Sequence, residues 1–270
     1  MAHKSIARLL VKPGSIVNLK RRVADDTLGW EKEAAKQELV DVISQIDALQ
    51  VKLAAAHSRS LLVVLQTMDA GGKDSTIRNV FGPLNAIGVR VNGFKAPAGD
   101  ELDHDYLWRV HAVAPGRGEI GVWNRSHYED VLVVRVKGFA AKLVWEKRYR
   151  HIREFERMLT DEGTAIVKIH LQISNEEQRV RLQERIDDPA KRWKFRVGDL
   201  DDRKLWPDFM KAYEVAFNET STDYAPWWIV PSERKWVRNL AVARIVLDAL
   251  QEINPQLPPD DPEIAGLTIE

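Results

Sequence analysis

A glycine-rich turn carries the residues of this sequence that are best suited to phosphate chemistry. The turn reads MDAGGKDST over residues 68–76, follows the apolar run LLVVLQ and precedes a stretch with helical spacing. In a parallel sheet, anions bind beyond the carboxyl ends of strands, where a helix start offers free N–H groups. The usual pattern has a glycine where this chain has Thr67 and a hydroxyl residue where it has Asp74. The turn is therefore a phosphate loop with an unusual sequence, or a glycine-rich surface turn with a solvated lysine.

The residue types within the turn indicate different roles in phosphate binding. The small residues let the backbone approach phosphate oxygens, and Lys73 can reach the phosphoryl group that is transferred. A carboxylate beside a phosphate is repelled unless a cation lies between them, so we expect Asp69 to hold Mg²⁺, or Mn²⁺ in its place. We expect the phosphate-binding residues to be Ala70, Gly71, Gly72, Lys73, Asp74, Ser75, Thr76 and Arg78.

A second group of polar residues follows the apolar run IGVWN in the stretch NRSHYED. Asn124 and Arg125 should reach the same edge of the sheet as the turn, and the planar guanidinium of Arg125 can bind a phosphate with two hydrogen bonds. Glu129 comes one turn later. Alone, Arg125 would fit a salt bridge in a loop, and Glu129 would fit a charge at a helix start. The turn at 69–76 makes a shared site the better interpretation.

A third group, DDPAKRWKFRVGD, lies within residues 185–206 and mixes cations with aromatic residues between two helical patterns. Asp188-Pro189 and Gly198 mark breaks in the chain. A bounded, basic segment of this kind is typical of a lid, which orders on a substrate, excludes water and adds cations to the site. An exposed basic loop with an aromatic packed beneath it is the alternative. We expect the lid residues to be Arg185, Lys191, Arg192, Trp193 and Lys194.

Apolar runs alternate with helical patterns along the chain, which predicts parallel βαβ units and a sheet covered on both faces. We expect five strands, at 61–66, 88–94, 120–124, 164–171 and 227–230. We expect helices at about 30–56, 74–86, 101–113, 142–160, 175–187, 203–219 and 233–252. With no internal repeat or low-complexity linker, residues 1–270 are expected to form a single domain.

Composition limits the function classes that need to be considered. The chain has no cysteine and a formal net charge of zero, which excludes thiol chemistry and disfavours a nucleic-acid binder of the basic kind. No apolar stretch is long enough to span a membrane, so we expect no membrane partner and a cytoplasmic location. Charge is uneven, however, because residues 1–22 hold six cations, including Lys4, and no acid. We interpret this segment as an arm that meets an anion or as a solvated tail.

Four stretches in order, MDAGGKDST, FKAPAGDELDHDYLWR, GEIGVWNRSHYEDVLVVRV and DDPAKRWKFRVGDLDDRKLW, resemble the type-2 polyphosphate kinases over roughly residues 30–240. The resemblance implies an α/β P-loop kinase fold, similar to thymidylate kinase, with a central parallel five-stranded sheet flanked by helices and a helical lid. It also implies an N-terminal helical extension at about 1–58. The loop resembles this family's version, DAxGKxxT, with Asp69 where the family holds its metal.

The resemblance also implies an activity. The enzyme would transfer the terminal phosphoryl group of inorganic polyphosphate to AMP and ADP, forming ADP and ATP reversibly, with Mg²⁺ and as a homo-oligomer, a dimer or a tetramer. Many members have an aspartate where this chain has Asn124, so we expect Glu129 to supply the missing charge. The implied catalytic residues are Asp69, Lys73, Arg125 and Glu129, and the implied nucleotide-binding residues are Asp100, His104, Asn124 and Arg125. Arg78, Lys95 and the N-terminal arm would line the polyphosphate groove.

Three other hypotheses stay open at this point. An ATP-dependent nucleoside monophosphate kinase would use the same loop, and only the phosphoryl donor separates the two. A non-catalytic binder of polyanions would need a basic surface and would not need Asp69. A P-loop that has lost its activity is disfavoured by the intact Lys73, Asp69 and Arg125.

Overall fold

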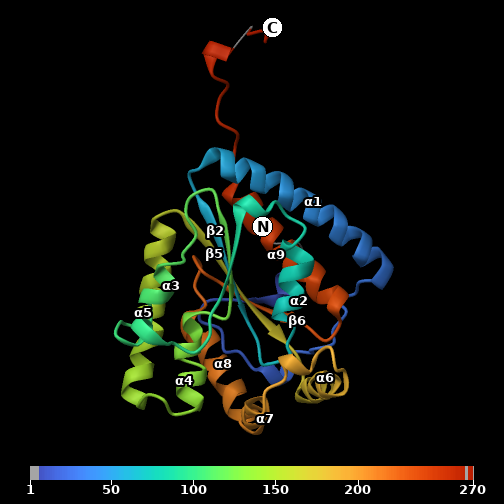
Figure 1. The fold of residues 1–270 in the computed structure, drawn as a ribbon, viewed down its shortest axis with the longest axis vertical. Coiled ribbons are helices and arrows are strands. Elements are labelled where there is room, and N and C mark those ends of the chain that lie inside the picture. Colours follow the sequence, from blue (N-terminus) through green and yellow to red (C-terminus); the bar gives the residue numbers. More distant parts are fainter. Residues whose placement is uncertain (1–5, 265–266, 270) are drawn as a thin grey trace.

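A single twisted sheet forms the centre of the computed structural model, which describes residues 6–264 and 267–269; Lys4 of the basic segment lies outside the described residues. Figure 1 shows the sheet between two groups of helices. The order of its strands is β1-β6-β5-β2-β4-β3. The strands are β1 (Leu10–Val11), β2 (Ser60–Gln66), β3 (Val89–Gly93), β4 (Ile120–Asn124), β5 (Thr164–Gln172) and β6 (Trp227–Pro231).

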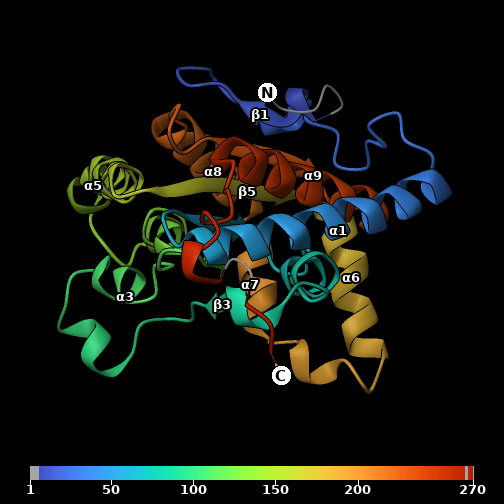
Figure 2. The same ribbon diagram turned by 90° about the horizontal axis from the view of Figure 1, so that it is seen from above.

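The five expected strands are confirmed, and they are parallel to one another. Every residue of β2 is buried, as expected for a strand covered on both faces. The sixth strand, β1, was not predicted. It pairs with β6 through only two residues and runs antiparallel to it, at the edge of the sheet opposite β3 (Figure 2).

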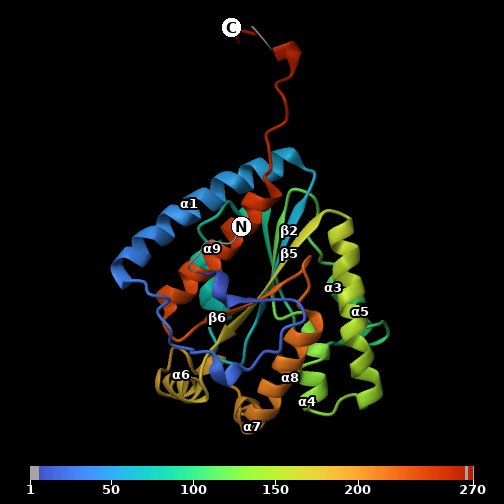
Figure 3. The same ribbon diagram turned by 180° about the vertical axis from the view of Figure 1, so that it is seen from behind.

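Helices cover the sheet in two layers, with α1 and α9 on one side and α5 and α8 on the other (Figures 1 and 3). Alternate residues of β2 divide between the two cores, Val63 joining the α1–α9 side and Val64 the α5–α8 side. The helices are α1 (Lys32–Ala56), α2 (Lys73–Thr76), α3 (Trp108–His111), α4 (Val133–Val136), α5 (Lys142–Asp161), α6 (Asn175–Asp187), α7 (Gly198–Lys204), α8 (Trp206–Thr220) and α9 (Lys235–Ile253).

Several predicted helices are shorter than the sequence pattern indicated. The prediction of a helix at 101–113 was wrong over most of that range. The carboxylate of Asp105 accepts a hydrogen bond from the backbone N–H of Leu107, and this turns the chain before α3 begins. The helix expected at 74–86 ends at Phe81, and that at 203–219 is divided between α7 and α8. Of the expected extension at 1–58, the structure describes residues 6–58, and within these α-helix occupies only Lys32–Ala56.

The sheet brings the three sequence motifs to one edge. Leu65 of β2 is directly paired with Asn124 of β4, so the loop after β2 and the turn after β4 leave the sheet side by side. The predicted lid, residues 185–206, contains the end of α6, a short 3-10 turn at Arg192–Lys194 and α7. Among the described residues, no helix combines the length and apolar character that are needed to cross a membrane.

Candidate active site

The loop after β2 has the backbone of a phosphate-binding turn. Gly72 has a φ of 106° and Ala70 a φ of 62°, both in the left-handed region. A φ of 106° strains any residue that has a Cβ, and a Cβ on Gly72 would also lie 2.2 Å from a guanidinium nitrogen of Arg238, so this position favours glycine. Thr67 stands where the usual pattern has its first glycine, and its hydroxyl donates to the carbonyl of Leu171 on β5. This version of the loop is thus held to the neighbouring strand by a side chain.

Lys73 begins α2 and is only lightly bound in this structure. Its ammonium donates one described hydrogen bond, to the carbonyl of Thr67 at 3.4 Å. Burial, and next the charge of Arg125, lower the pKa of Lys73 to about 8, although Asp69 and Glu129 act in the opposite direction. An ammonium that has three N–H groups and one long contact retains donors for a ligand.

Arg125 lies between two carboxylates. Its guanidinium donates to Asp69 Oδ1 at 2.9 Å and is 3.8 Å from Glu129 Oε2. Burial raises the pKa of Glu129, while Arg125 and Lys73 lower it. With its amide nitrogen toward Glu129, Gln66 donates to Oε1 at 3.0 Å. The cation next to Asp69 is therefore the Arg125 side chain, which the sequence argument had assigned to phosphate alone.

A pocket joins Arg125 and its two carboxylate partners to helices α7 and α8. Asp69, Arg125 and Glu129 share it with Asp202 of α7, and Asp202 also forms an ion pair with Lys137 at 2.6 Å. The remaining lining residues are Thr67, Met68, Leu132, Val133, Phe209 and Tyr213. The contributions of α7 and α8 were not predicted, because nothing in their sequence spacing points to this edge of the sheet.

Two of the carboxylates that line the same pocket could hold a divalent cation. No group of three or more His, Asp or Glu side chains in the described part of the chain could hold a metal ion without further ligands. Mg²⁺ in phosphoryl-transfer sites typically takes only one or two carboxylates and completes its shell with water and substrate phosphates. Asp69 and Glu129, both lining the pocket, fit that requirement.

Other predicted site residues are less directly involved. Asn124 donates to Asp74 Oδ1 at 2.8 Å, so its amide holds the start of α2. His104 stacks on Trp108 at 4.1 Å, and neither His104 nor Asp100 lines the pocket. Arg78 is exposed on the turn that continues α2. The structure thus brings Asp69, Lys73, Arg125 and Glu129 together and leaves Asp100 and His104 on the loop that follows β3.

The cations of the predicted lid contact other parts of the lid. Lys191 pairs with Asp188 at 2.8 Å, and Arg192 donates to the carbonyl of Ile186 at 2.7 Å. Trp193 is 76% exposed, with the ammonium of Lys194 over its ring at 5.1 Å. The guanidinium of Arg185 is 3.7 Å from Asp199. These cations do not contact the loop in this conformation.

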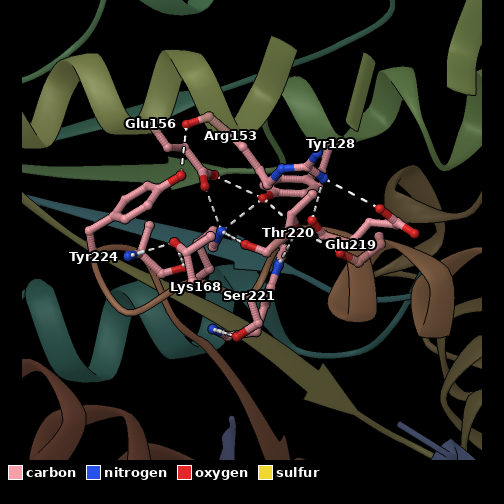
Figure 4. A network of polar contacts seen from close by, with 12 residues as sticks. Tyr128, Arg153, Glu156, Lys168, Glu219, Thr220, Ser221 and Tyr224 are labelled. Carbon is pink, nitrogen blue, oxygen red and sulfur yellow. Dashed lines mark hydrogen bonds and ion pairs between the residues drawn. The ribbon is translucent and has the colours of Figure 1, made fainter. Parts of the chain in front are cut away.

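A second charged cluster surrounds Lys168 and includes Tyr128, which belongs to the same turn as Arg125 and Glu129 (Figure 4). Lys168 of β5 donates to Glu156 at 2.6 Å, to the Tyr128 hydroxyl at 2.9 Å and to the carbonyl of Thr220 at 2.7 Å. Tyr128 is flanked in sequence by Glu129, so the cluster fixes one side of the turn while the other faces the pocket.

A parallel α/β sheet with a glycine-rich loop, a lysine at its helix start and an arginine on the adjacent strand end defines a kinase of the P-loop class. The chain belongs to the Polyphosphate kinase 2 family, whose model matches residues 29–258. It is 52% identical over 262 residues to an AMP/ADP-polyphosphate phosphotransferase of Meiothermus ruber, covering 96% of this chain and 98% of the relative. It is 40% identical over 244 residues to an ADP-polyphosphate phosphotransferase of Rhodopseudomonas palustris, covering 86% and 84%.

A solved structure agrees with the fold. The crystal structure of Polyphosphate Kinase 2 from Arthrobacter aurescens TC1 superimposes with a TM-score of 0.93 at 41% identity, covering 98% of this chain and 95% of that one. The family and the P-loop kinase fold expected from the four sequence stretches are confirmed, and the protein is a phosphotransferase of this kind.

Proposed function

We propose that this enzyme transfers the terminal phosphoryl group of inorganic polyphosphate to AMP and to ADP, and that the reaction is reversible. The observation that carries the proposal is the set of Lys73, Arg125, Asp69 and Glu129 around one phosphate loop in a chain of this family. The 52% identity to a relative named for AMP and ADP supports the choice of acceptors.

The proposed chemistry is in-line phosphoryl transfer through a loose transition state, in which the protein positions groups and neutralises charge. The N–H groups at the start of α2 and the ammonium of Lys73 bind the transferring phosphoryl group. The guanidinium of Arg125 either moves from Asp69 to the phosphate oxygens or donates hydrogen bonds to both Asp69 and the phosphate. Mg²⁺, held by Asp69 and Glu129, would neutralise phosphate charge when bound. The acceptor is already a phosphate, so no strong general base is needed.

The neutral Asn124 supports the use of both acceptors. AMP and ADP differ by one phosphate, so a site that uses both must accept acceptors of different charge near the loop. A carboxylate at this position would penalise the more highly charged ADP, whereas the amide of Asn124 carries no charge and is held by Asp74 at 2.8 Å. Two further expectations, a homo-oligomer and a cytoplasmic location, stay predictions.

A donor panel tests the proposal. The protein is incubated with Mg²⁺ and each of AMP, ADP, GMP and GDP, with either inorganic polyphosphate or ATP as the phosphoryl donor, and products are separated by chromatography. We expect polyphosphate to phosphorylate AMP and ADP. Efficient transfer to AMP from ATP, with none from polyphosphate, would instead identify an ATP-dependent nucleoside monophosphate kinase. Binding of polyphosphate without any transfer would identify a polyanion-binding protein.

A further inference from the structure

The backbone carbonyl groups of the phosphate loop accept hydrogen bonds from surrounding side chains. Four successive carbonyls, those of residues 69–72, each accept a hydrogen bond from a side chain. The donors are Gln178 to Asp69 at 3.1 Å, Arg181 to Ala70 at 3.1 Å, Ser232 to Gly71 at 2.7 Å and Thr76 to Gly72 at 3.1 Å. Because a peptide group is planar, fixing its carbonyl also fixes the direction of its N–H group. These donors therefore set the orientation of the groups that bind phosphate.

Two of the four donors, Gln178 and Arg181, lie one turn apart on α6. This helix continues directly into the predicted lid, and Figure 1 shows α6 and α7 beside each other at the same end of the sheet. Helix α6 is thus both a support for the phosphate loop and the base of the lid.

Gln178 contacts the loop and the lid at the same time. It is fully buried; its amide nitrogen donates to the carbonyl of Asp69, and its amide oxygen accepts from the guanidinium of Arg203 on α7 at 3.3 Å. Arg203 also donates to the carbonyl of Asn175, at the start of α6.

The chemistry of the three groups fixes the orientation of this amide. A guanidinium can only donate, so it must face the amide oxygen of Gln178, and a carbonyl can only accept, so it must face the amide nitrogen. Removing Arg203 would leave the buried amide without the partner that selects this orientation. The carbonyl concerned belongs to Asp69, whose carboxylate accepts from Arg125 at 2.9 Å.

We propose that Gln178 is a positioning residue of the phosphoryl-transfer site, through which docking of α7 aligns Asp69 and the phosphate loop. The reaction named here rests on the proposed function, whereas the link between lid and loop rests on the contacts of Gln178. Docked α7 holds the Gln178 amide toward the loop, and the loop then presents its N–H groups in a fixed direction. When α7 moves away, the carbonyl of Asp69 loses an oriented donor.

A set of four variants tests the link through activity. Gln178→Met removes both contacts, Gln178→Glu keeps the acceptor for Arg203 but cannot donate to Asp69, and Arg203→Met removes the lid contact. The matched control is Gln183→Met, because Gln183 is on the same helix but exposed and donates to Asp187. We expect Gln178→Met and Gln178→Glu to lower kcat about tenfold, the effect of losing one hydrogen bond, with KM changed less than about twofold. Gln183→Met should have wild-type kcat.

Non-additivity separates a link from two independent defects. If Arg203 acts through Gln178, the double variant Gln178→Met/Arg203→Met should be no slower than the slower single variant, within about twofold. Arg203→Lys, which keeps a donor, should recover part of the activity lost in Arg203→Met. Effects that multiply in the double variant would overturn the proposal. Thermal unfolding shows whether each variant is folded. If Gln178→Met is unfolded, the comparison of kcat between Arg203→Met and Arg203→Lys tests the link instead.

Limited proteolysis gives a readout that does not need turnover. A protease that cuts after lysine and arginine is added with or without inorganic polyphosphate and Mg²⁺, and cleavage at Lys191, Arg192 and Lys194 is followed by mass spectrometry. We expect polyphosphate to protect these sites in the wild type and in Gln183→Met, and to protect them much less in Gln178→Met. Equal protection in Gln178→Met, or none in the wild type, would overturn the link. If the protein phosphorylates no nucleotide but Gln178→Met still loses protection by polyphosphate, the link between lid and loop is upheld and the proposed function is refuted.

Discussion

Two lysines that lie on either side of the same turn differ in how fully their donors are used. The ammonium of Lys168 has three acceptors within 2.9 Å and no exposed surface (Figure 4). The ammonium of Lys73 has one described acceptor, at 3.4 Å, and lines the start of α2. Both lysines come from buried surroundings that lower their pKa, with burial as the largest cause.

The number of occupied hydrogen-bond donors distinguishes a lysine with a structural role from one that is able to bind a ligand. Lys168 is neutralised by Glu156 and its hydrogen bonds are complete, so it can offer nothing to a ligand and stabilises the turn above it. Lys73 keeps free donors at the edge where phosphate would bind. The carboxylates that act most strongly on its pKa, Asp69 and Glu129, also form ion pairs with Arg125. Burial separates the two lysines only in degree, because Lys168 is fully buried and Lys73 is partly buried, whereas counting their acceptors distinguishes them clearly.

The largest expected effect comes from removing the lysine with free donors. Lys73→Ala should lower kcat/KM by about 10³-fold or more, because it deletes a cation that stabilises the transition state. Its melting temperature should stay close to that of the wild type, since one long hydrogen bond is lost. Steady-state kinetics with polyphosphate and ADP, together with thermal unfolding, provide the measurement. A folded Lys73→Ala enzyme with wild-type activity would exclude this loop as the site.

Removing the other lysine should have the opposite pattern. Lys168→Met leaves Glu156 buried without its cation, which should lower the free energy of unfolding by about 3–5 kcal/mol. Activity per folded molecule should change little, because Lys168 does not face the pocket. Chemical denaturation and activity are measured on the same preparation. A stable but inactive variant would mean that the distinction between the two clusters is wrong.

The sequence was sufficient for the strands and for the residues that meet at the edge of the sheet. Apolar runs rich in Val, Leu and Ile predicted four of the five parallel strands, because such runs are typical of a strand that is covered on both faces. The fifth, β3, was predicted from the pattern GVRVNGF, and its residues are exposed or half-buried at the edge of the sheet. Parallel strands end at a common edge, so the sequence alone placed Lys73 and Arg125 together. Their roles in catalysis stay predictions.

The parts that were not predicted depend on tertiary packing or on local turns. Strand β1 has two residues and too short a pattern to recognise. Gln178 and Arg181 resemble any polar residues of a charged helix, and only the packing of α6 against the loop gives them a role. The sequence did offer a signal for Arg238, a charged residue among the apolar residues of helix α9. Arg238 is buried there and donates to the hydroxyl of Ser75 at 3.0 Å.

Asp69 refines the comparison between the two lysines. It lies in the cluster around Lys73, whose donors are free, but its own carboxylate already accepts a hydrogen bond from Arg125. Asp69→Asn keeps an acceptor oxygen for Arg125 and removes only the charge. We expect the rate to fall about 10²-fold and the Mg²⁺ concentration for half-maximal rate to rise, with partial rescue at high Mg²⁺. Initial rates across a Mg²⁺ titration provide the measurement. An unchanged titration curve would refute the role of Asp69 as a metal ligand.

The smallest expected effect is a pH dependence that belongs to Lys73 alone. Burial lowers its pKa to about 8, and the protonated form is the one that binds phosphate. Raising the pH through 8 therefore removes the active form, and kcat/KM, which reports the free enzyme, should be roughly tenfold lower at pH 9 than at pH 7. Lys73→Arg should flatten this fall, because arginine stays charged. A profile for the wild type that is flat up to pH 9 would contradict the assignment.

The central claim, that this chain moves phosphoryl groups from polyphosphate to nucleotides at the Lys73 loop, is tested most directly by a time course with AMP. The protein is mixed with AMP, Mg²⁺ and inorganic polyphosphate as the only phosphoryl donor, and AMP, ADP and ATP are quantified together. We predict that AMP is consumed, that ADP rises first and that ATP follows on prolonged reaction. Unchanged AMP in the presence of folded protein and polyphosphate would contradict the account.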